Sequence, residues 1–275
     1  MGRMLFSERF PAFYSLAQKK ETARRHLRDL FSFEKIAATH MEAPLPNLVK
    51  AHSSVLIRRL EGVDLTLQES KVTNIRLACE KINGLVIRPG ETFSFWRTVG
   101  KPGAANGYKE GLVIGGGRVG SGVGGGLCQM GNLIHWMVLN SPLEVTELHH
   151  HSDALFPDDR RRVPFGTGTS VMYNSVDYRF RNNTNQSVQL LVWICDGALC
   201  GELRSERPFH CSYRLTEENH HFRPEGNDFY RISQVYRFVI SNATGETLKK
   251  ELILDNHSKV MYDHALIPPQ EIRAD

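Results

Sequence analysis

Apolar residues are spaced in two different ways along the 275-residue chain. Residues 1–40 and 74–82 carry an apolar side chain every three or four positions, which is typical of amphipathic helices. The same spacing after Cys128 predicts a third helix, which ends at Asn140. The remaining apolar residues form short runs between turn residues, which favours strands, and the strongest of these runs is Val188–Cys195.

These runs predict a mostly β-stranded core. Strands are expected over residues 55–57, 85–87, 91–96, 112–114, 118–119, 143–148, 170–180 and 188–195. Two further edge strands are expected over residues 230–240 and 250–254. We therefore predict an α+β fold with a single β-rich core over residues 50–205. A helical extension over residues 1–49 precedes this core, and a β-rich extension over residues 206–275 follows it.

Composition and charge limit the class of protein. With 41% hydrophobic and 23% charged residues, the chain has enough apolar side chains to bury a core. Its net charge of +4 is too small to indicate a nucleic-acid partner. No apolar run approaches the roughly 20 residues that a membrane-spanning helix needs, and no secretory signal is recognisable. We therefore expect a cytoplasmic protein.

The N-terminal helix leaves two interpretations open. One of its faces is apolar, and a basic cluster follows that face, with Lys19, Lys20, Arg24, Arg25 and Arg28. The helix either docks against the rest of the protein or makes peripheral contact with a membrane surface. In the second case the protein would work at the cytoplasmic face of the membrane.

Cys128 is the strongest candidate for a reactive group. More than half of the 23 glycines stand between Gly100 and Gly131, and the run Gly122–Gly126 leads directly to this cysteine at the start of a predicted helix. A helix N-terminus favours thiolate over thiol, so we expect a lowered pKa for Cys128. Backbone amides near Gly125 and Gly126, together with Gln129, are candidates for holding an oxyanion or substrate. The alternative is a cysteine packed in the core.

The candidate base for this thiol comes from three consecutive histidines. A helix and a returning strand separate them from Cys128, so they can come back close to it. In a strand His149 and His151 share a face with Glu147, which is placed to orient an imidazole, and Asp153 is a competing orienter. His135 lies two helical turns after Cys128 on the same face.

The histidines also admit two other interpretations. One is a divalent-metal site formed by His149, His151 and a nearby carboxylate. The other is a polar strand end without a chemical role. We rank a general base first, the polar strand end second and a metal site third. The five cysteines include no CxxC pair, so neither a thiolate zinc site nor a cofactor is predicted.

Two stretches resemble the VanW family. The first is residues 90–158, from GETFSFW to ALFPD, and contains the distinctive GVGGGLCQ; the second is PFGTGTSVMYNSVDYRFRNNTNQSVQLLVWI at residues 164–194. The N-terminal helix and residues 52–60 resemble the short members that lack a signal peptide. The chain has Glu147-Leu148-His149-His150-His151-Ser152 where many members read ERHPHS, and Gly168-Thr169-Ser170 where many have Asp-Ala-Thr.

The resemblance implies a link to glycopeptide resistance. Short members are accessory proteins of vancomycin resistance, and larger extracytoplasmic members include peptidoglycan L,D-transpeptidases with a cysteine nucleophile. It implies that Cys128 is that nucleophile and that His151 is its histidine. The expected partner is a peptidoglycan stem peptide, or a cytoplasmic precursor if the protein stays inside the cell. The two hypotheses are a cysteine acyl-transferase or peptidase, and a non-catalytic accessory or binding protein.

Overall fold

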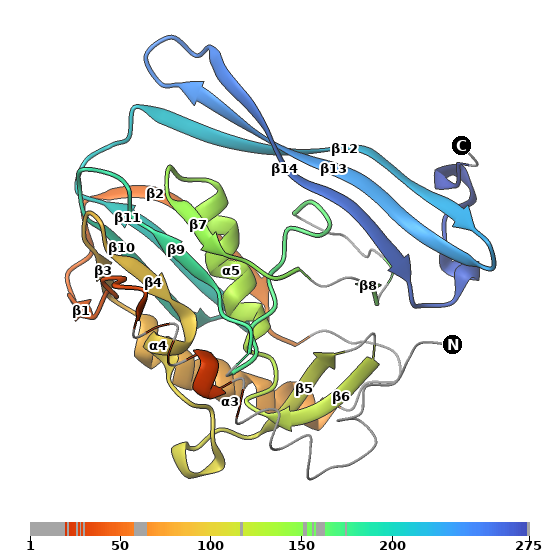
Figure 1. Ribbon diagram of the computed structural model, residues 1–275, viewed down its shortest axis with the longest axis horizontal. Coiled ribbons are helices and arrows are strands. Elements are labelled where there is room, and N and C mark those ends of the chain that lie inside the picture. Colours follow the sequence, from red (N-terminus) through yellow and green to blue (C-terminus); the bar gives the residue numbers. More distant parts are fainter. Residues whose placement is uncertain are drawn as a thin grey trace.

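The computed structural model describes residues 20–57 except 21, 26, 28 and 30, and residues 65–273 except 116, 117, 151, 152, 156, 158–162 and 174. Its fold is α+β and rich in strands, as predicted (Figure 1). Residues 1–19 of the predicted N-terminal helix lie outside the described residues. The described residues between 20 and 31 are helical, but residues 32–40 are not. Their backbone instead pairs with strands, through Ile36 and β1, so the predicted helix over 1–40 is too long.

The main sheet has five strands in an antiparallel arrangement, in the order β1-β3-β10-β11-β2. Their bounds are Thr39–His40, Leu85–Ile87, Val188–Cys195, Ala198–Ser205 and Asn47–Val55. The predictions for β3 and β10 are confirmed. The strand expected over residues 55–57 is wrong in position, because β2 ends at Val55. Strand β11 was not predicted, because its residues alternate between buried and half-buried and form no apolar run.

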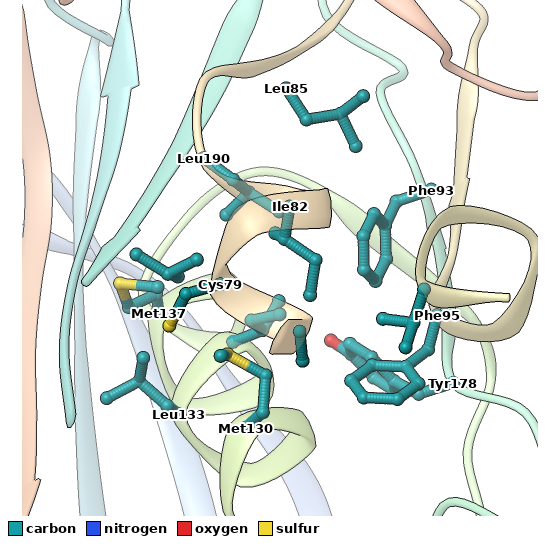
Figure 2. Packing of buried hydrophobic residues seen from close by; sticks show 14 of the residues in the cluster. Cys79, Ile82, Leu85, Phe93, Phe95, Met130, Leu133, Met137, Tyr178 and Leu190 are labelled. Carbon is teal, nitrogen blue, oxygen red and sulfur yellow. The ribbon is translucent and has the colours of Figure 1, made fainter. Parts of the chain in front are cut away.

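Two helices bury their apolar faces against this sheet and each other. Helix α3 spans Leu65–Ile82, longer than predicted, and α5 spans Cys128–Leu139 as the spacing predicts. Figure 2 shows Met130, Leu133 and Met137 of α5 in one cluster with Cys79 and Ile82 of α3. Gly201 in β11 allows α5 to approach, because a Cβ there would lie 2.7 Å from the Leu133 side chain.

A second, smaller sheet has the order β4-β9-β7. Its strands are Thr92–Ser94, Arg179–Arg181 and Glu144–Glu147, and the short helix α4 (Phe95–Val99) follows β4. The prediction over 143–148 is confirmed by β7. The strands expected over 91–96 and 170–180 are wrong in extent, because the first turns into α4 and the second forms a strand only near its end.

The glycine-rich centre forms a hairpin, with β5 at Glu110–Gly115 paired to β6 at Arg118–Val123, and the strands expected over residues 112–114 and 118–119 fall inside these two.

The C-terminal extension supplies three long strands of a separate sheet, to which the two-residue strand β8 adds at one edge, in the order β12-β13-β14-β8 (Figure 1). Its strands are Cys211–Glu225, Asp228–Ser241, Thr247–Val260 and Asp153–Ala154. The two predicted C-terminal strands fall inside β13 and β14 but are too short. Within the described residues, no helix is long and apolar enough to cross a membrane.

Candidate functional site

The glycine run before Cys128 is shaped by its packing against α3 and β5. A Cβ on Gly125 would lie 2.2 Å from the backbone carbonyl of Gly111. Asn74, fully buried on α3, ties the two segments together, since its side-chain amide donates to the carbonyls of Lys109 and Gly125 and its oxygen accepts from the Lys109 amide. The glycines are therefore required for close backbone approach, independently of any substrate.

The last glycine of the run aims the chain into α5. Gly126 has a φ of 93°, in the region that favours glycine, and a Cβ there would lie 1.9 Å from the Lys71 side chain. Leu127 precedes the helix, and Cys128 is its first residue. The sequence thus places Cys128 correctly at a helix N-terminus.

The sulfur of Cys128 has a neutral environment. Its Sγ donates to the carbonyl oxygen of Val171 at 3.6 Å. Burial is the largest influence on the Cys128 thiol and raises its pKa. The prediction of a lowered pKa is therefore wrong, because desolvation of the thiolate exceeds the stabilisation that the helix N-terminus offers. The thiol is protonated at neutral pH.

The predicted oxyanion residues have other partners. The amide of Gly125 donates to the Gly122 carbonyl, and that of Gln129 donates to the Gly126 carbonyl. The Gln129 side chain donates to Ser54 Oγ at 2.8 Å and to the Val55 carbonyl at 2.9 Å, which fastens α5 to the end of β2. Only the Gly126 amide, of the three predicted residues, has no backbone acceptor among the described residues.

The segment around residues 168–171 connects the cysteine to the histidines. Ser170 donates its amide to the His149 carbonyl at 2.7 Å, and the next residue, Val171, accepts from Cys128. His149 Nε2 contacts Glu147 Oε1 at 3.1 Å, which brings together two of the predicted site residues. His150 points elsewhere, with Nδ1 3.0 Å from the Gly166 carbonyl. His151 and Ser152 lie outside the described residues.

Two further residues of α5, Asn132 and His135, belong to this region. Asn132 was not predicted from the sequence, and His135 was predicted only to share a helix face with Cys128. Asn132, one turn after Cys128, accepts from the Thr169 amide at 2.7 Å, and a Cβ on Gly168 would lie 3.1 Å from the same Asn132 oxygen. His135 is 1% exposed, and its Nδ1 contacts the Tyr178 hydroxyl at 3.1 Å. Burial, followed by the charge of His150, lowers the pKa of His135 to about 3. His135 is therefore neutral at physiological pH.

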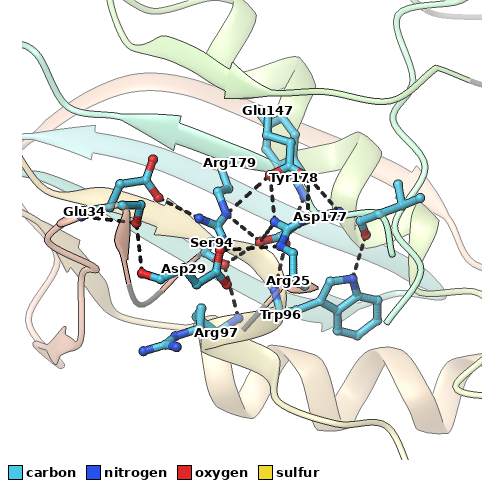
Figure 3. A network of polar contacts seen from close by, with 12 residues as sticks. Arg25, Asp29, Glu34, Ser94, Trp96, Arg97, Glu147, Asp177, Tyr178 and Arg179 are labelled. Carbon is cyan, nitrogen blue, oxygen red and sulfur yellow. Dashed lines mark hydrogen bonds and ion pairs between the residues drawn. The ribbon is translucent and has the colours of Figure 1, made fainter. Parts of the chain in front are cut away.

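A network of charges lies beside β7 and β9 (Figure 3). Arg25, from the N-terminal segment, donates to both carboxylate oxygens of Glu147 at 2.7 Å and also reaches Asp177 at 3.2 Å. Arg179 of β9 bridges Asp177 at 2.8 Å, Asp29 at 2.8 Å and Glu34 at 2.6 Å. The N-terminal segment thus docks on the core through ion pairs.

Asp177 is at the centre of this network. It is 2% exposed and accepts from Ser94 Oγ at 2.6 Å and from the Trp96 amide at 3.0 Å, in addition to the two arginines. The sequence indicates Arg25 only as part of the basic cluster of the N-terminal segment and gives no role to Asp177 or Arg179, because most of their partners are far away along the chain.

The network also sets the charge state of Glu147. Burial alone would raise the pKa of Glu147, but hydrogen bonds from Arg25 and His149 and the charges of Arg25 and Arg179 outweigh it, so the pKa is lowered. Hydrogen bonds and charge from Asp177 and Asp29 likewise overcome burial and raise the pKa of Arg179. Glu147 and Arg179 are therefore both ionised at neutral pH.

The other predicted chemistry has no counterpart among the described residues. None of them form a group of three or more His, Cys, Asp or Glu placed to hold a metal ion. Asp153 opens β8 and pairs with Lys259 of β14, so its backbone belongs to the C-terminal sheet. Cys195 and Cys200 form a disulfide across the β10–β11 hairpin, which leaves Cys79, Cys128 and Cys211 as free thiols.

Comparison with known proteins connects this geometry to a family. Residues 70–204 match the family model described as VanW like protein. The chain is 30% identical over 262 residues to the vancomycin B-type resistance protein VanW of Enterococcus faecalis (strain ATCC 700802 / V583), which covers 95% of each chain. It is also 32% identical over 120 residues to the uncharacterized protein YoaR of Bacillus subtilis (strain 168), over 44% of this chain and 38% of YoaR. No solved structure matches the chain.

Proposed function

Because the chain belongs to the VanW family, we propose that it takes part in glycopeptide resistance as a cysteine-dependent acyl-transferase or peptidase. Its substrates are peptidoglycan stem peptides or their cytoplasmic precursors, and Cys128 is the nucleophile. The relative that matches nearly the whole chain is named for vancomycin B-type resistance, which supports the first part. The position of Cys128 at the start of α5 supports the second part, that Cys128 is the nucleophile.

The chemistry follows from a thiol that is neutral before substrate binds. The Cys128 sulfur attacks a peptide carbonyl as an imidazole takes the thiol proton, and the carbon–nitrogen bond then breaks. The leaving amine takes that proton, and a thioester remains on Cys128. An acceptor amine or water then attacks the thioester, gives up a proton to the imidazole and releases the sulfur, which is reprotonated.

His149 is the described histidine best suited to this role. The Glu147 carboxylate accepts a hydrogen bond, so His149 Nε2 must donate it, which leaves Nδ1 as the nitrogen that can take a proton. Glu147 is itself held by Arg25 and therefore fixed in orientation. The hydrogen bond from Ser170 to the His149 carbonyl sets His149 next to the segment that contacts the Cys128 sulfur. His151, the base that the family resemblance implies, lies outside the described residues and stays a prediction.

The test compares two cysteine variants. Purified wild-type, Cys128→Ala and Cys211→Ala proteins are incubated with a stem pentapeptide and an amine acceptor, and products are followed by mass spectrometry. Cys211 is a half-buried free thiol in the C-terminal sheet, so its variant controls for loss of any thiol. We expect product and a thioester-linked adduct with wild type and Cys211→Ala, and neither with Cys128→Ala. Equal activity of all three proteins contradicts the proposal.

One observation favours a second function, a non-catalytic accessory or binding protein. The Cys128 thiol donates to the Val171 carbonyl and has a raised pKa, and Cys128 lines neither the cavity beside Arg231 nor the cavity beside Tyr213. In this case Cys128→Ala leaves glycopeptide susceptibility of a host unchanged. Arg25→Ala, which removes the ion pairs of Arg25 with Glu147 and Asp177, alters this susceptibility. Fractionation of the same cells tests the proposed cytoplasmic location and the contact with the membrane face.

A further inference from the structure

A cavity of about 370 Å³ lies between the main sheet and the C-terminal sheet. Its walls come from residues around the start of β2, the end of α5, and the segment that runs from the end of β11 into β12, which passes above the main sheet in Figure 1. Cavities of this volume are typical of small-molecule sites. Asn140, the C-cap of α5, belongs to the lining, so the cavity is separated from Cys128 by the length of this 12-residue helix, roughly 18 Å.

The lining of the cavity belongs entirely to the described part of the chain, and Lys50 is its only charged residue. Lys50 pairs with Leu203 of β11, a fully buried core residue, and paired residues of antiparallel strands point to the same face of a sheet. The Lys50 side chain therefore leaves β2 on the face that α5 covers, and its Nζ lies 5.8 Å from the centre of the Trp136 ring on that helix. No carboxylate among the described residues is paired with this ammonium, which can turn on its flexible four-carbon stem.

The other polar side chains of the lining are of two kinds. Four of them already hold the walls by donating to backbone carbonyls: Asn47, Asn140, Ser205 and Asn242. The Cys211 thiol and the hydroxyls of Ser212 and Tyr213, by contrast, have no hydrogen-bond partner within the described part of the chain. Burial is the largest influence on Tyr213 and raises its pKa, so this hydroxyl keeps its proton at neutral pH and can donate. The groups left for a ligand are therefore an ammonium and three groups that can donate a hydrogen bond.

We propose that this cavity binds a small organic carboxylate with an apolar body. The ligand's carboxylate accepts hydrogen bonds from the Lys50 ammonium and the Tyr213 hydroxyl, and hydrogen bonds between charged groups are stronger than neutral ones. Its apolar body packs against Pro208 and the Phe209 ring, which belong to the apolar part of the lining. The site does not depend on the proposed acyl transfer, because it lies at the opposite end of α5 from Cys128.

Charge complementarity separates this class of ligand from the others. A cation would meet the like charge of Lys50, and no carboxylate of the lining would receive it. A phosphate monoester would bring about two negative charges to one ammonium. The carboxylate that acts on Tyr213, that of Glu251, is paired with Arg237 and Lys249, each at 2.7 Å, so its charge is balanced. A single carboxylate on the ligand therefore matches the single charge of the lining.

Cys211 provides the readout for the test, because it is a free thiol in the lining. The full chain is alkylated with iodoacetamide, and the rate at each cysteine is followed by mass spectrometry at increasing concentrations of phenylacetate, phenylacetamide or phenethylamine. These probes share a phenyl ring and carry a negative charge, no charge and a positive charge. We expect phenylacetate to slow alkylation of Cys211 saturably, and the amide and the amine to bind at least about tenfold more weakly, as for loss of a charge-assisted hydrogen bond. The rate at Cys128 is expected to stay unchanged.

Three variants of lysine locate the binding. Lys50→Gln is expected to weaken phenylacetate about tenfold while it leaves the neutral amide unchanged. Lys50→Arg keeps the charge and is expected to bind phenylacetate nearly as wild type does, which separates loss of the charge from damage to the fold. Lys81→Gln, at an exposed position in the last turn of α3, is the matched charge control and is expected to change nothing.

Each contrary result overturns the proposed site. The first is no saturable protection of Cys211 by phenylacetate at millimolar concentration, and the second is equal protection by the three probes. Unchanged binding in Lys50→Gln, or equal loss in Lys81→Gln, overturns it as well. Protection of Cys128 in place of Cys211 would put the carboxylate at the start of α5, which would contradict this site without affecting the proposed function of Cys128.

Discussion

The loop that leads into α5 and the charge network beside β7 are joined by the segment from Gly168 to Arg179, yet different forces hold them. Around Cys128 the contacts are steric or neutral: close glycine backbones, an amide from Asn74 and a thiol on a carbonyl. Around Asp177 they are ionic, with two guanidiniums against four carboxylates.

This contrast separates the two chemical roles that the sequence assigned. The candidate nucleophile lies in the neutral region, where desolvation keeps it protonated. The candidate base, His149, and its orienting Glu147 lie in the charged region, where ionised groups are stabilised. An acyl transfer therefore needs a proton to pass from the first region to the second as substrate binds. The two regions should also respond differently to substitution and to pH.

The largest expected effect on stability follows from removing the negative charge of Asp177, at the centre of the network. Asp177→Asn keeps the shape of the side chain but leaves the buried guanidinium of Arg179 without its most deeply buried counter-charge. We expect a loss of about 3–5 kcal/mol in the free energy of unfolding, as measured by urea denaturation. Glu144→Gln neutralises an exposed carboxylate of β7 and should cost about 0.5 kcal/mol or less. Equal losses in both variants would contradict the expectation that the buried ion pairs of the network stabilise the fold more than an exposed carboxylate does.

A single added methyl group in the neutral region around Cys128 is expected to destabilise the fold. In Gly125→Ala the new Cβ meets the Gly111 backbone at 2.2 Å, and a backbone cannot rotate away as a side chain can. We expect a loss of roughly 1–3 kcal/mol or more in the same denaturation measurement. Gly103→Ala is the matched control, because nothing lies within 4 Å of its Cβ position. A stable Gly125→Ala protein would show that the loop can move away from β5.

These two regions also differ in how far the sequence predicts them. The start of α5 was predictable, because a glycine run, a cysteine and helical apolar spacing are neighbours in the chain. Strands β3 and β10 were predictable because β3 is buried at every residue and β10 over its first three, so both form apolar runs. The partners of Arg25 on the core, Glu147 and Asp177, are 122 and 152 positions away, and only the fold brings them together. The raised pKa of Cys128 was missed for a similar reason, since burial is a property of the tertiary structure.

Acid pH should reveal a buried neutral group between the two regions. In the unfolded chain His135 takes up a proton near pH 6.5, whereas in the folded protein it stays neutral to about pH 3. The unfolded state therefore binds more protons in this interval, and stability falls as the pH drops through it. From pH 7 to pH 5 we expect His135 to account for a loss of roughly 2 kcal/mol.

The measurement compares wild type with His135→Phe, which keeps a ring but cannot titrate. Both proteins are unfolded with urea at pH 7 and pH 5. The variant has lost the contact with Tyr178, so its stability is lower at both pH values, but the drop between them should be smaller than in wild type. Since Glu147 and the other acids titrate in both proteins, the difference isolates His135. Parallel pH dependence in the two proteins would contradict a buried, neutral His135.

The smallest effect concerns the reactivity of the cysteine, and it sharpens the comparison most directly. Burial raises the pKa of Cys128 above that of an ordinary thiol, so its thiolate fraction at neutral pH is lower than that of a free thiol. Alkylation by iodoacetamide, followed at each cysteine by mass spectrometry, should therefore show a midpoint for Cys128 at a higher pH than for an ordinary thiol. The same cysteine in urea-unfolded protein is the internal control, with the midpoint of an ordinary thiol. A folded-state midpoint below that of the unfolded chain would show that the helix N-terminus and a nearby imidazole outweigh burial. The thiol would then be activated before substrate binds, and no proton transfer from the neutral to the charged region would be needed.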